Sequence, residues 1–251
     1  MASSKVKSKS RPGGLLDNVK TLVYAALIAI GIRTFLLEPF NIPSGSMIPT
    51  LLVGDYLFVE KYSYGYSRYS FPFSPPLFEG RIFGSLPRRG DVAVFALPRD
   101  PSIDYIKRIV GLPGDTIQVM HSRLFINGKE APRQRDGTYT MTGQGPPIVM
   151  RRYLETLPDG VKHSILQESN NGPLSNTGIY KVPPGFVFAM GDNRDDSEDS
   201  RVLSAVGYIP LQNLIGRAAF IFFSIDAEYP WWEFWEWPVE IRWGRLFSTI
   251  T

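Results

Sequence analysis

The chain has 251 residues, a formal net charge of +3 and 43% apolar residues, enough for one large globular domain or two small ones. It contains no cysteine, which excludes disulfides, cysteine-ligated metals and thiol catalysis. With 21 prolines and 23 glycines, we expect many turns and little long helix.

The N-terminal part predicts a basic tail followed by one membrane-spanning helix. Residues 1–17 are polar and basic, and we expect a disordered cytoplasmic tail. Residues 18–37 are mostly apolar, and as a helix the stretch from Val19 to Leu37 would be roughly 28 Å long, close to the thickness of a bilayer core. Because the basic flank precedes the span, the positive-inside rule keeps the N-terminus in the cytoplasm.

Residues 18–37 have two alternative interpretations, a buried core helix and a cleaved signal peptide. A buried core helix would be shorter and would carry a polar stripe. A cleaved signal peptide needs a small-x-small site, for which Ala29-Ile30-Gly31 is a weak match that is followed by further apolar residues. An uncleaved single span therefore fits best.

A rigid loop follows the predicted span directly. Pro43 and Pro49 exclude a helix across it, and between them Ser44-Gly45-Ser46 places two hydroxyls on a backbone that can turn sharply. Such a loop could present a serine nucleophile close to the membrane. Taken alone, it could also be an ordinary linker, since Ser, Gly and Pro are common loop residues.

The rest of the chain predicts a mostly β fold. Short apolar runs bounded by turn residues indicate strands at 52–60, 92–96, 104–110, 116–120, 123–126, 186–190 and 218–225. Residues 129–180 are polar and rich in loop residues, and Asn127-Gly128 is the strongest turn signal. We expect one β domain formed by 38–115 and 183–251, with an inserted β subdomain at 116–182.

Lys107 is the candidate base within the predicted strand 104–110. Alternation places Tyr105 and Lys107 on one face and Ile106 and Arg108 on the other, so the pattern does not say which cation is buried. Lysine is the better candidate, because an amine can lose its proton when desolvated and a guanidinium cannot. A neutral amine beside a serine hydroxyl would be a general base without histidine, although a single lysine in a strand is usually solvated.

The acidic segment 191–201 is a candidate structural network. As a calcium loop it fails, because Arg194 occupies the third position and the glycine expected at the sixth is missing. A solvated surface loop remains open, as does a network in which Asp192 and Asp199 pair with Arg194 and Arg201. The sequence has no G-x-S-x-G motif, no H-E-x-x-H metal motif and no recognisable nucleic-acid motif.

Three segments together resemble the signature motifs of bacterial type I signal peptidases, a family of Ser/Lys-dyad serine proteases. They are Pro43-Ser44-Gly45-Ser46-Met47-x-Pro49-Thr50-Leu51, Tyr105-Ile106-Lys107-Arg108-x-Val110-Gly111-Leu112-Pro113-Gly114-Asp115 and Gly191-Asp192-Asn193-Arg194-Asp195-x-Ser197-x-Asp199-Ser200-Arg201. The resemblance implies a mostly β domain with a β insertion, preceded by a transmembrane helix. The soluble self-cleaving repressors of the SOS response share this chemistry, but they have no membrane anchor. Some family members have two spans, whereas this chain predicts one.

The resemblance also implies roles for individual residues. Ser46 matches the nucleophile and Lys107 the general base, with the Ser44 hydroxyl and the Ser46 N–H as the oxyanion hole. Ser197 matches the serine that orients the lysine. Supporting roles fall to two acidic and two basic residues: Asp199, Arg201, Asp192 and Arg194. The pocket walls would be Phe40, Ile42, Pro43, Leu51, Tyr105 and Ile106, and no metal or cofactor is implied.

The implied function is a membrane-bound serine endopeptidase that removes N-terminal signal peptides after a small-x-small motif through an acyl-enzyme. The expected location is the bacterial inner membrane, with the catalytic domain on the periplasmic side. The expected partners are preprotein signal peptides, the lipid bilayer and, transiently, the export machinery, but no nucleic acid. A specialised single-substrate maturation peptidase and a non-catalytic peptide-binding β domain are the alternatives.

Two aromatic segments have no role in this chemistry. The stretch Trp231–Trp237 fits either an interfacial aromatic belt or packing against the β domain. The same choice applies to Phe71-Pro72-Phe73.

Overall fold

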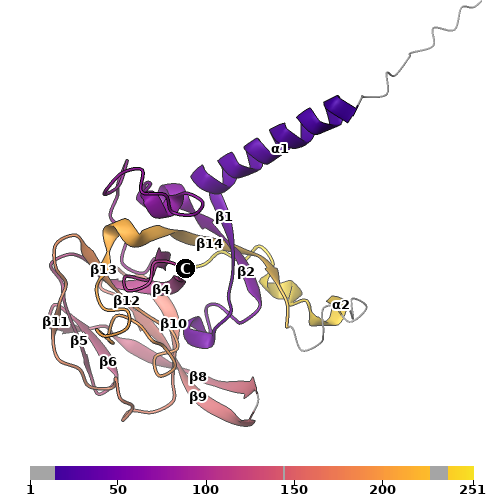
Figure 1. Cartoon of the computed structure of the whole chain (residues 1–251). Helices are drawn as coiled ribbons and strands as arrows, with labels where there is room; N and C mark the ends of the chain where they lie inside the picture. The colour runs from indigo at the N-terminus through magenta and orange to yellow at the C-terminus, as the bar shows by residue number, and fades with distance from the viewer. Residues whose placement is uncertain (1–14, 144, 227–236) are drawn as a thin grey trace, which may run out of the picture.

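A computed structural model of the chain describes residues 15–143, 145–226 and 237–251. Helix α1 (Leu15–Phe35) projects from a body built mostly of β-strands, as predicted (Figure 1). By length and composition its stretch Asp17–Phe35 could cross a membrane. The mean hydropathy is 1.3, and 6% of the apolar window is buried against the rest of the protein. The helix ends before Pro39, which lies in strand β1 (Leu37–Asn41). The predicted tail lies mostly outside the described residues.

Seven strands form the main sheet, in the order β1-β2-β14-β3-β4-β12-β13, with antiparallel pairing throughout. The remaining bounds are β2 (Asp55–Glu60), β3 (Val92–Ala96), β4 (Asp104–Gly111), β12 (Phe186–Met190), β13 (Ile209–Pro210) and β14 (Leu214–Ser224). Strand β14 begins four residues before the predicted 218–225. Because β4 lies between β3 and β12, Lys107 sits inside the sheet and the acidic segment starts beside it.

Both faces of the main sheet are covered. In β3, Val92 and Val94 pack in one core cluster, and Ala93 and Phe95 pack in another. Alternate residues of a strand point to opposite faces, so the fully buried pattern of β3 records two buried faces. The interior of this sheet can therefore hold a desolvated side chain.

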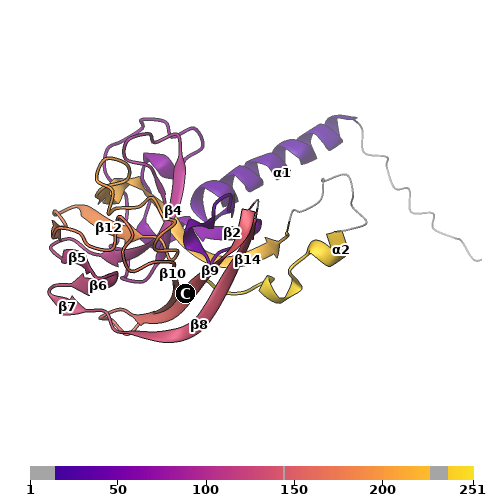
Figure 2. The same ribbon diagram turned by 90° about the horizontal axis from the view of Figure 1, so that it is seen from below.

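Two smaller sheets are built from the segment between β4 and β12. One has the order β11-β5-β6-β7, with β5 (Thr116–Met120), β6 (Arg123–Ile126), β7 (Lys129–Glu130) and β11 (Tyr180–Lys181). The other has the order β10-β9-β8, with β8 (Arg133–Gly143), β9 (Gly145–Thr156) and β10 (Lys162–Gln167). Strands β8 and β9 form a long curved hairpin (Figure 2), where the polar composition predicted loops.

Two tight turns connect the strands of the first of these sheets. His121 and Ser122, with φ of 48° and 60°, join β5 to β6. Asn127 and Gly128, with φ of 53° and 74°, join β6 to β7, so the predicted turn at this pair is present. Both pairs have two central residues with positive φ, the conformation of a type I′ hairpin turn.

Short helices and the C-terminal segment complete the body. The 3₁₀ turns are η1 (Gly45–Met47), η2 (Lys61–Tyr64), η3 (Arg68–Ser70), η4 (Leu211–Asn213) and η5 (Trp243–Arg245), and one further helical turn is α2 (Trp237–Glu240). After α2 the chain returns along the sheet, where Ile241 pairs with Ile225 and Thr249 with Phe220. Of the Trp-rich stretch, residues 231–236 lie outside the described residues.

Candidate active site

Ser46 lies in a loop that is fixed from both sides. It is the central residue of η1, and its neighbours Met47 and Leu51 are fully buried in the core. From the acidic segment, the Asn193 N–H donates to the Ser46 carbonyl oxygen over 3.1 Å, and the Asn193 amide donates to the Gly45 carbonyl oxygen over 3.2 Å. The backbone that carries the Ser46 side chain is therefore fixed.

Lys107 of β4 meets this loop. Its Nζ lies 2.6 Å from Ser46 Oγ, and only 4% of the lysine is exposed. Burial lowers the pKa of Lys107 to about 8, although the carboxylates of Asp199, Asp192, Glu198 and Asp196 oppose that shift. The amine thus reaches its neutral, proton-accepting form much closer to neutral pH than an exposed lysine does.

Ser44 lies beside the Ser46 hydroxyl and is exposed to solvent. It has an extended backbone with φ of −130° and ψ of 155°, and its Oγ is 3.5 Å from Ser46 Oγ. A hydroxyl at this position can donate to an oxygen atom bound beside Ser46.

Within the acidic segment, Asp199 and Arg201 form a buried bidentate pair. Arg201 Nε donates to Asp199 Oδ1 over 2.9 Å and Nη2 to Oδ2 over 2.8 Å, while the Gly191 N–H also donates to Oδ2. Burial raises the pKa of Asp199, but the charge and hydrogen bonds of Arg201 hold it below its ordinary value. Asp199 is therefore a charged anchor for the segment that supports Ser46.

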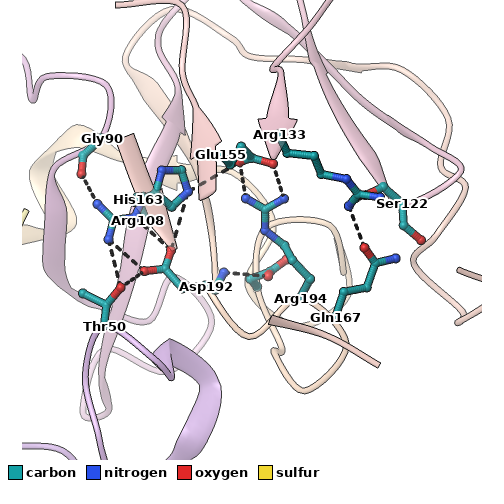
Figure 3. Close-up of polar contacts among 12 residues, drawn as sticks. Thr50, Gly90, Arg108, Ser122, Arg133, Glu155, His163, Gln167, Asp192 and Arg194 are labelled. Atoms are coloured by element: carbon teal, nitrogen blue, oxygen red, sulfur yellow. Dashed lines mark hydrogen bonds and ion pairs between the residues drawn. The ribbon is translucent and has the colours of Figure 1, made fainter. Parts of the chain in front are cut away.

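Asp192 and Arg194 take other partners than the predicted ones (Figure 3). Asp192 accepts two hydrogen bonds of 2.8 Å from Arg108 and one of 2.5 Å from the Thr50 hydroxyl. Arg194 forms a bidentate pair with Glu155 of β9, where one of the two hydrogen bonds measures 2.9 Å. Of the pairs that the sequence left open within 191–201, Asp199 with Arg201 forms. Asp192 and Arg194 each pair with a residue outside that segment.

His163 joins these two pairs. Its Nε2 lies 3.4 Å from a Glu155 carboxylate oxygen and 3.9 Å from one of Asp192, and Figure 3 shows the imidazole between the two. The His163 side chain has no exposed surface. Neither Glu155 nor His163 is predicted from the sequence, because nothing in the polar stretch 129–180 marks a carboxylate that will be fully buried. Alternation left open whether Lys107 or Arg108 is the buried cation of β4, and both are buried.

Gly191 lies tightly between Ser197 and the loop that carries Ser46. A Cβ built on Gly191 would lie 2.2 Å from Ser197 Oγ and 2.6 Å from the Ser46 carbonyl oxygen, so only glycine fits between them. Ser197 Oγ is buried and has no hydrogen-bond partner among the described residues. A buried hydroxyl without a partner is uncommon and is free to interact with a group that enters the site.

A pocket of about 390 Å³ opens beside Ser46 and Lys107. Five of the six predicted wall residues line it: Phe40, Ile42, Pro43, Tyr105 and Ile106. Leu51 does not line it, because it is fully buried in the core with Met47. Three carboxylates, those of Asp104, Asp196 and Glu198, also border the pocket.

Sequence comparison identifies the family of this chain. The family described as "Signal peptidase, peptidase S26" matches residues 15–223. Signal peptidase I of Rickettsia typhi is 40% identical and covers 93% of this chain and 97% of its own length. Signal peptidase I of Rickettsia conorii is 44% identical, with coverage of 85% and 80%. A crystal structure of a signal peptidase I from Enterococcus faecalis aligns with 53% of this chain and 97% of its own, at 22% identity and a TM-score of 0.30.

Proposed function

The chain belongs to the peptidase S26 family of signal peptidases, and we propose that Ser46 and Lys107 are the dyad with which it cleaves signal peptides from preproteins. The single observation that carries this assignment is the 2.6 Å contact between the lysine amine and the serine hydroxyl beside an open pocket. A base in hydrogen-bond contact with a hydroxyl is the geometry that nucleophilic catalysis requires.

In the proposed mechanism, neutral Lys107 removes the proton from Ser46 Oγ as this oxygen attacks the carbonyl carbon before the scissile bond. The C–N bond then breaks, Lys107 donates the proton to the leaving amine, and an ester with Ser46 remains. Water attacks this ester, Lys107 accepts a proton from the water, and the signal peptide leaves with a free carboxylate. The proton finally returns to Ser46 Oγ, so each group ends as it began.

The oxyanion of both tetrahedral intermediates would be held by the Ser44 hydroxyl and the Ser46 N–H. The 3.5 Å between the two Oγ atoms supports this role for Ser44. Ser197 would orient the lysine amine, a role supported by its unpartnered hydroxyl beside the nucleophile loop. The buried Asp199–Arg201 pair would hold the segment that carries Ser197.

We further propose that the pocket accepts small residues, usually alanine, at the first and third positions before the cut. Ile42, Ile106 and Tyr105 line the pocket, and the apolar side chains of the two isoleucines would limit its depth. An extended substrate beside residues 40–44 would be held by strand-like backbone hydrogen bonds.

The apolar α1 is consistent with a membrane-anchored protein. We propose that it is a single span of the bacterial inner membrane with a cytoplasmic N-terminus, and that the β body lies on the periplasmic side. We also propose that 38–115 and 183–251 form the catalytic domain, with 116–182 as an inserted subdomain. Transient contact with the export machinery is part of the same proposal.

The test uses the full chain and a preprotein whose signal ends in Ala-x-Ala. We expect cleavage after the second alanine, and we expect Ser46→Ala and Lys107→Ala each to lower kcat by at least about a thousandfold. Ser204→Ala and Lys181→Ala, which replace exposed residues of the same types, serve as matched controls. Full processing by a folded Lys107→Ala variant would rule out the dyad.

A further inference from the structure

The pocket beside Ser46 carries negative charge that the described residues do not neutralise. Its acidic lining residues are Asp104 of β4 and, in the acidic segment, Asp196 and Glu198. Within the described ranges, none of these three carboxylates forms an ion pair. Lys107 is the one cation among the described residues that line this pocket, and it is buried. A bound peptide therefore meets a pocket whose exposed charges are all negative.

Asp196 and Glu198 lie close to the atoms of the proposed reaction. Both residues are exposed. One oxygen of the Asp196 carboxylate would lie 3.6 Å from a Cβ built on Gly45, the residue before the nucleophile. The Glu198 carboxylate accepts a hydrogen bond of 3.3 Å from the hydroxyl of Tyr105, which also lines the pocket. A peptide bound over the dyad can reach both carboxylates.

The backbone that carries these two carboxylates is fixed. The Asp196 N–H donates to the Asn193 carbonyl oxygen over 3.3 Å, and the buried pair of Asp199 and Arg201 follows in the chain. Between the two carboxylates, Ser197 is 8% exposed, and its hydroxyl has no hydrogen-bond partner in the part of the chain that the structure describes. Charges that are placed in advance discriminate between ligands, because little has to be ordered when the ligand binds.

The proposed path of the substrate shows which of its residues would meet this charge. The peptide before the cut is proposed to lie beside residues 40–44, with its last carbonyl at Ser46. The chain after the cut then leaves Ser46 in the direction away from residues 40–43. Asp196 lies beside Gly45 at that end of the loop, so the first residues after the cut pass its carboxylate.

A second pocket extends the first on the same side. It has a volume of about 530 Å³ and shares Tyr105 and Glu198 with the first pocket, but none of residues 40–46 lines it. Arg99 also lines this second pocket, so the excess of negative charge is greatest close to Ser46. The first two residues of the mature chain are therefore the ones whose charge matters most.

The two exposed carboxylates also act against the proposed base. Asp196 and Glu198 raise the pKa of Lys107 and so favour its protonated form. Asp192 and Asp199 have the same effect, but each of them already pairs with an arginine. A cationic group on the substrate would offset the field of the two unpaired carboxylates.

We propose that Asp196 and Glu198 are specificity residues that select preproteins with lysine or arginine among the first two residues of the mature chain. The two carboxylates bind the substrate cation and take no part in proton transfer. This inference rests on the proposed function, because it concerns the substrate of the same dyad.

The test compares three peptides that are identical up to an Ala-x-Ala cut and carry two lysines, two glutamines or two glutamates after it. At low ionic strength we expect kcat/KM for the lysine peptide to exceed that for the glutamate peptide about tenfold, with the glutamine peptide between them. At about 0.5 M salt the difference should shrink, because exposed charges are screened. Equal values for the three peptides at low ionic strength would overturn the proposal.

A double variant assigns the preference to the two carboxylates. In Asp196→Asn, Glu198→Gln, the lysine-to-glutamate ratio of kcat/KM should fall to about one. The matched control, Glu79→Gln, Glu168→Gln, removes two charges at exposed positions outside both pockets and should keep the ratio. The ratio is the measure because a changed pKa of Lys107 affects all three peptides alike. A ratio that persists in the first variant, or is lost in the control, would overturn the proposal.

Charge reversal separates specificity from a structural role. Asp196→Lys, Glu198→Lys should cut the glutamate peptide fastest, and a general loss of activity with the original order would overturn the proposal. If the unaltered protein cut none of the peptides, the proposed function would fail. The charge preference would still be decided on the Ser46→Ala variant by fluorescence anisotropy, where the lysine peptide should bind tightest and equal dissociation constants would overturn the inference.

Discussion

The amine of Lys107 and the hydroxyl of Ser46 lie 2.6 Å apart, although 61 positions separate the two residues in the chain. Three elements meet to produce this contact: the loop after β1, the interior strand β4 and the acidic segment after β12. The lysine is desolvated because both faces of the sheet are covered, and the serine is fixed because Asn193 holds its loop. His163 is not part of this contact, because its side chain lies between the carboxylates of Glu155 and Asp192.

The pKa of Lys107 predicts the pH dependence of catalysis. Below a pKa of about 8 the amine is protonated and has no lone pair to accept the Ser46 proton, and above it the base is available. We therefore expect kcat/KM to rise with pH and to level off above about 8. The measurement is a pH profile with a soluble peptide.

Removing the nearby carboxylates should move that profile. Asp196 and Glu198 both raise the pKa of Lys107, so the variant Asp196→Asn, Glu198→Gln should lower it and shift the rise in kcat/KM to lower pH. Glu168→Gln, at an exposed carboxylate outside the pocket, is the control and should leave the profile in place. A shift to higher pH in the double variant would contradict the electrostatic account.

Ser44→Ala tests the oxyanion hole. Loss of one such donor typically lowers kcat by about a hundredfold to a thousandfold, and we expect KM to change little because the donor acts on the transition state. Steady-state kinetics measure this split, and Ser44→Thr, which keeps a hydroxyl, should recover part of the rate. A higher KM with unchanged kcat would assign Ser44 to substrate binding instead.

The buried pair of Glu155 and Arg194 should matter for stability. Glu155→Gln leaves the Arg194 guanidinium buried without its anion, and breaking such a pair typically costs about 3–5 kcal/mol of unfolding free energy. Chemical denaturation measures this loss. Glu130→Gln breaks the exposed pair with Arg123, and as the matched control it should cost less than about 1 kcal/mol.

The same pair makes stability depend on pH. Burial raises the pKa of Glu155, but Arg194 and His163 hold it well below its ordinary value in the folded protein. The stabilisation is therefore fully present above the unfolded pKa of about 4.3 and is lost as the pH falls toward the folded one. The variant Glu155→Leu, Arg194→Met should remove this acid sensitivity. If acid destabilised this variant as much as the unaltered protein, other carboxylates would be responsible.

The overall architecture could be predicted because helices and strands are indicated by residues that are close together in the sequence. The apolar run of α1 and the turn-bounded strands such as Val92–Ala96 are specified by residues close in sequence, and the mostly β fold is confirmed. The family and its peptidase activity, expected from three motifs, are confirmed as well. The roles of individual residues stay predictions, although the contact between Ser46 and Lys107 meets the condition that they require.

What the sequence did not predict depends on contacts between distant segments. Alternation along β4 could not show that Lys107 and Arg108 are both buried, because it does not indicate whether one or both faces of the sheet are covered. Likewise, Arg194 finds its partner on β9, 39 positions earlier, and no composition signal links the two. Leu51 was assigned to the pocket by motif alone, whereas its complete burial follows from packing of the loop.

We expect Ile106 to limit the size of the side chain that the pocket accepts. Ile42 and Ile106 line the pocket beside Ser46, so Ile106→Ala should deepen it and admit valine where alanine is preferred before the cut. A difference of one or two methylenes in an apolar pocket is worth about 1–3 kcal/mol, so we expect the preference for alanine over valine to fall about tenfold. The ratio of kcat/KM for two matched peptides measures it, and this ratio does not depend on the amount of folded enzyme. Ile148→Ala, at a 45% exposed position of β9 outside the pocket, should leave the ratio unchanged. An equal change in both variants would mean that Ile106 does not form the specificity wall.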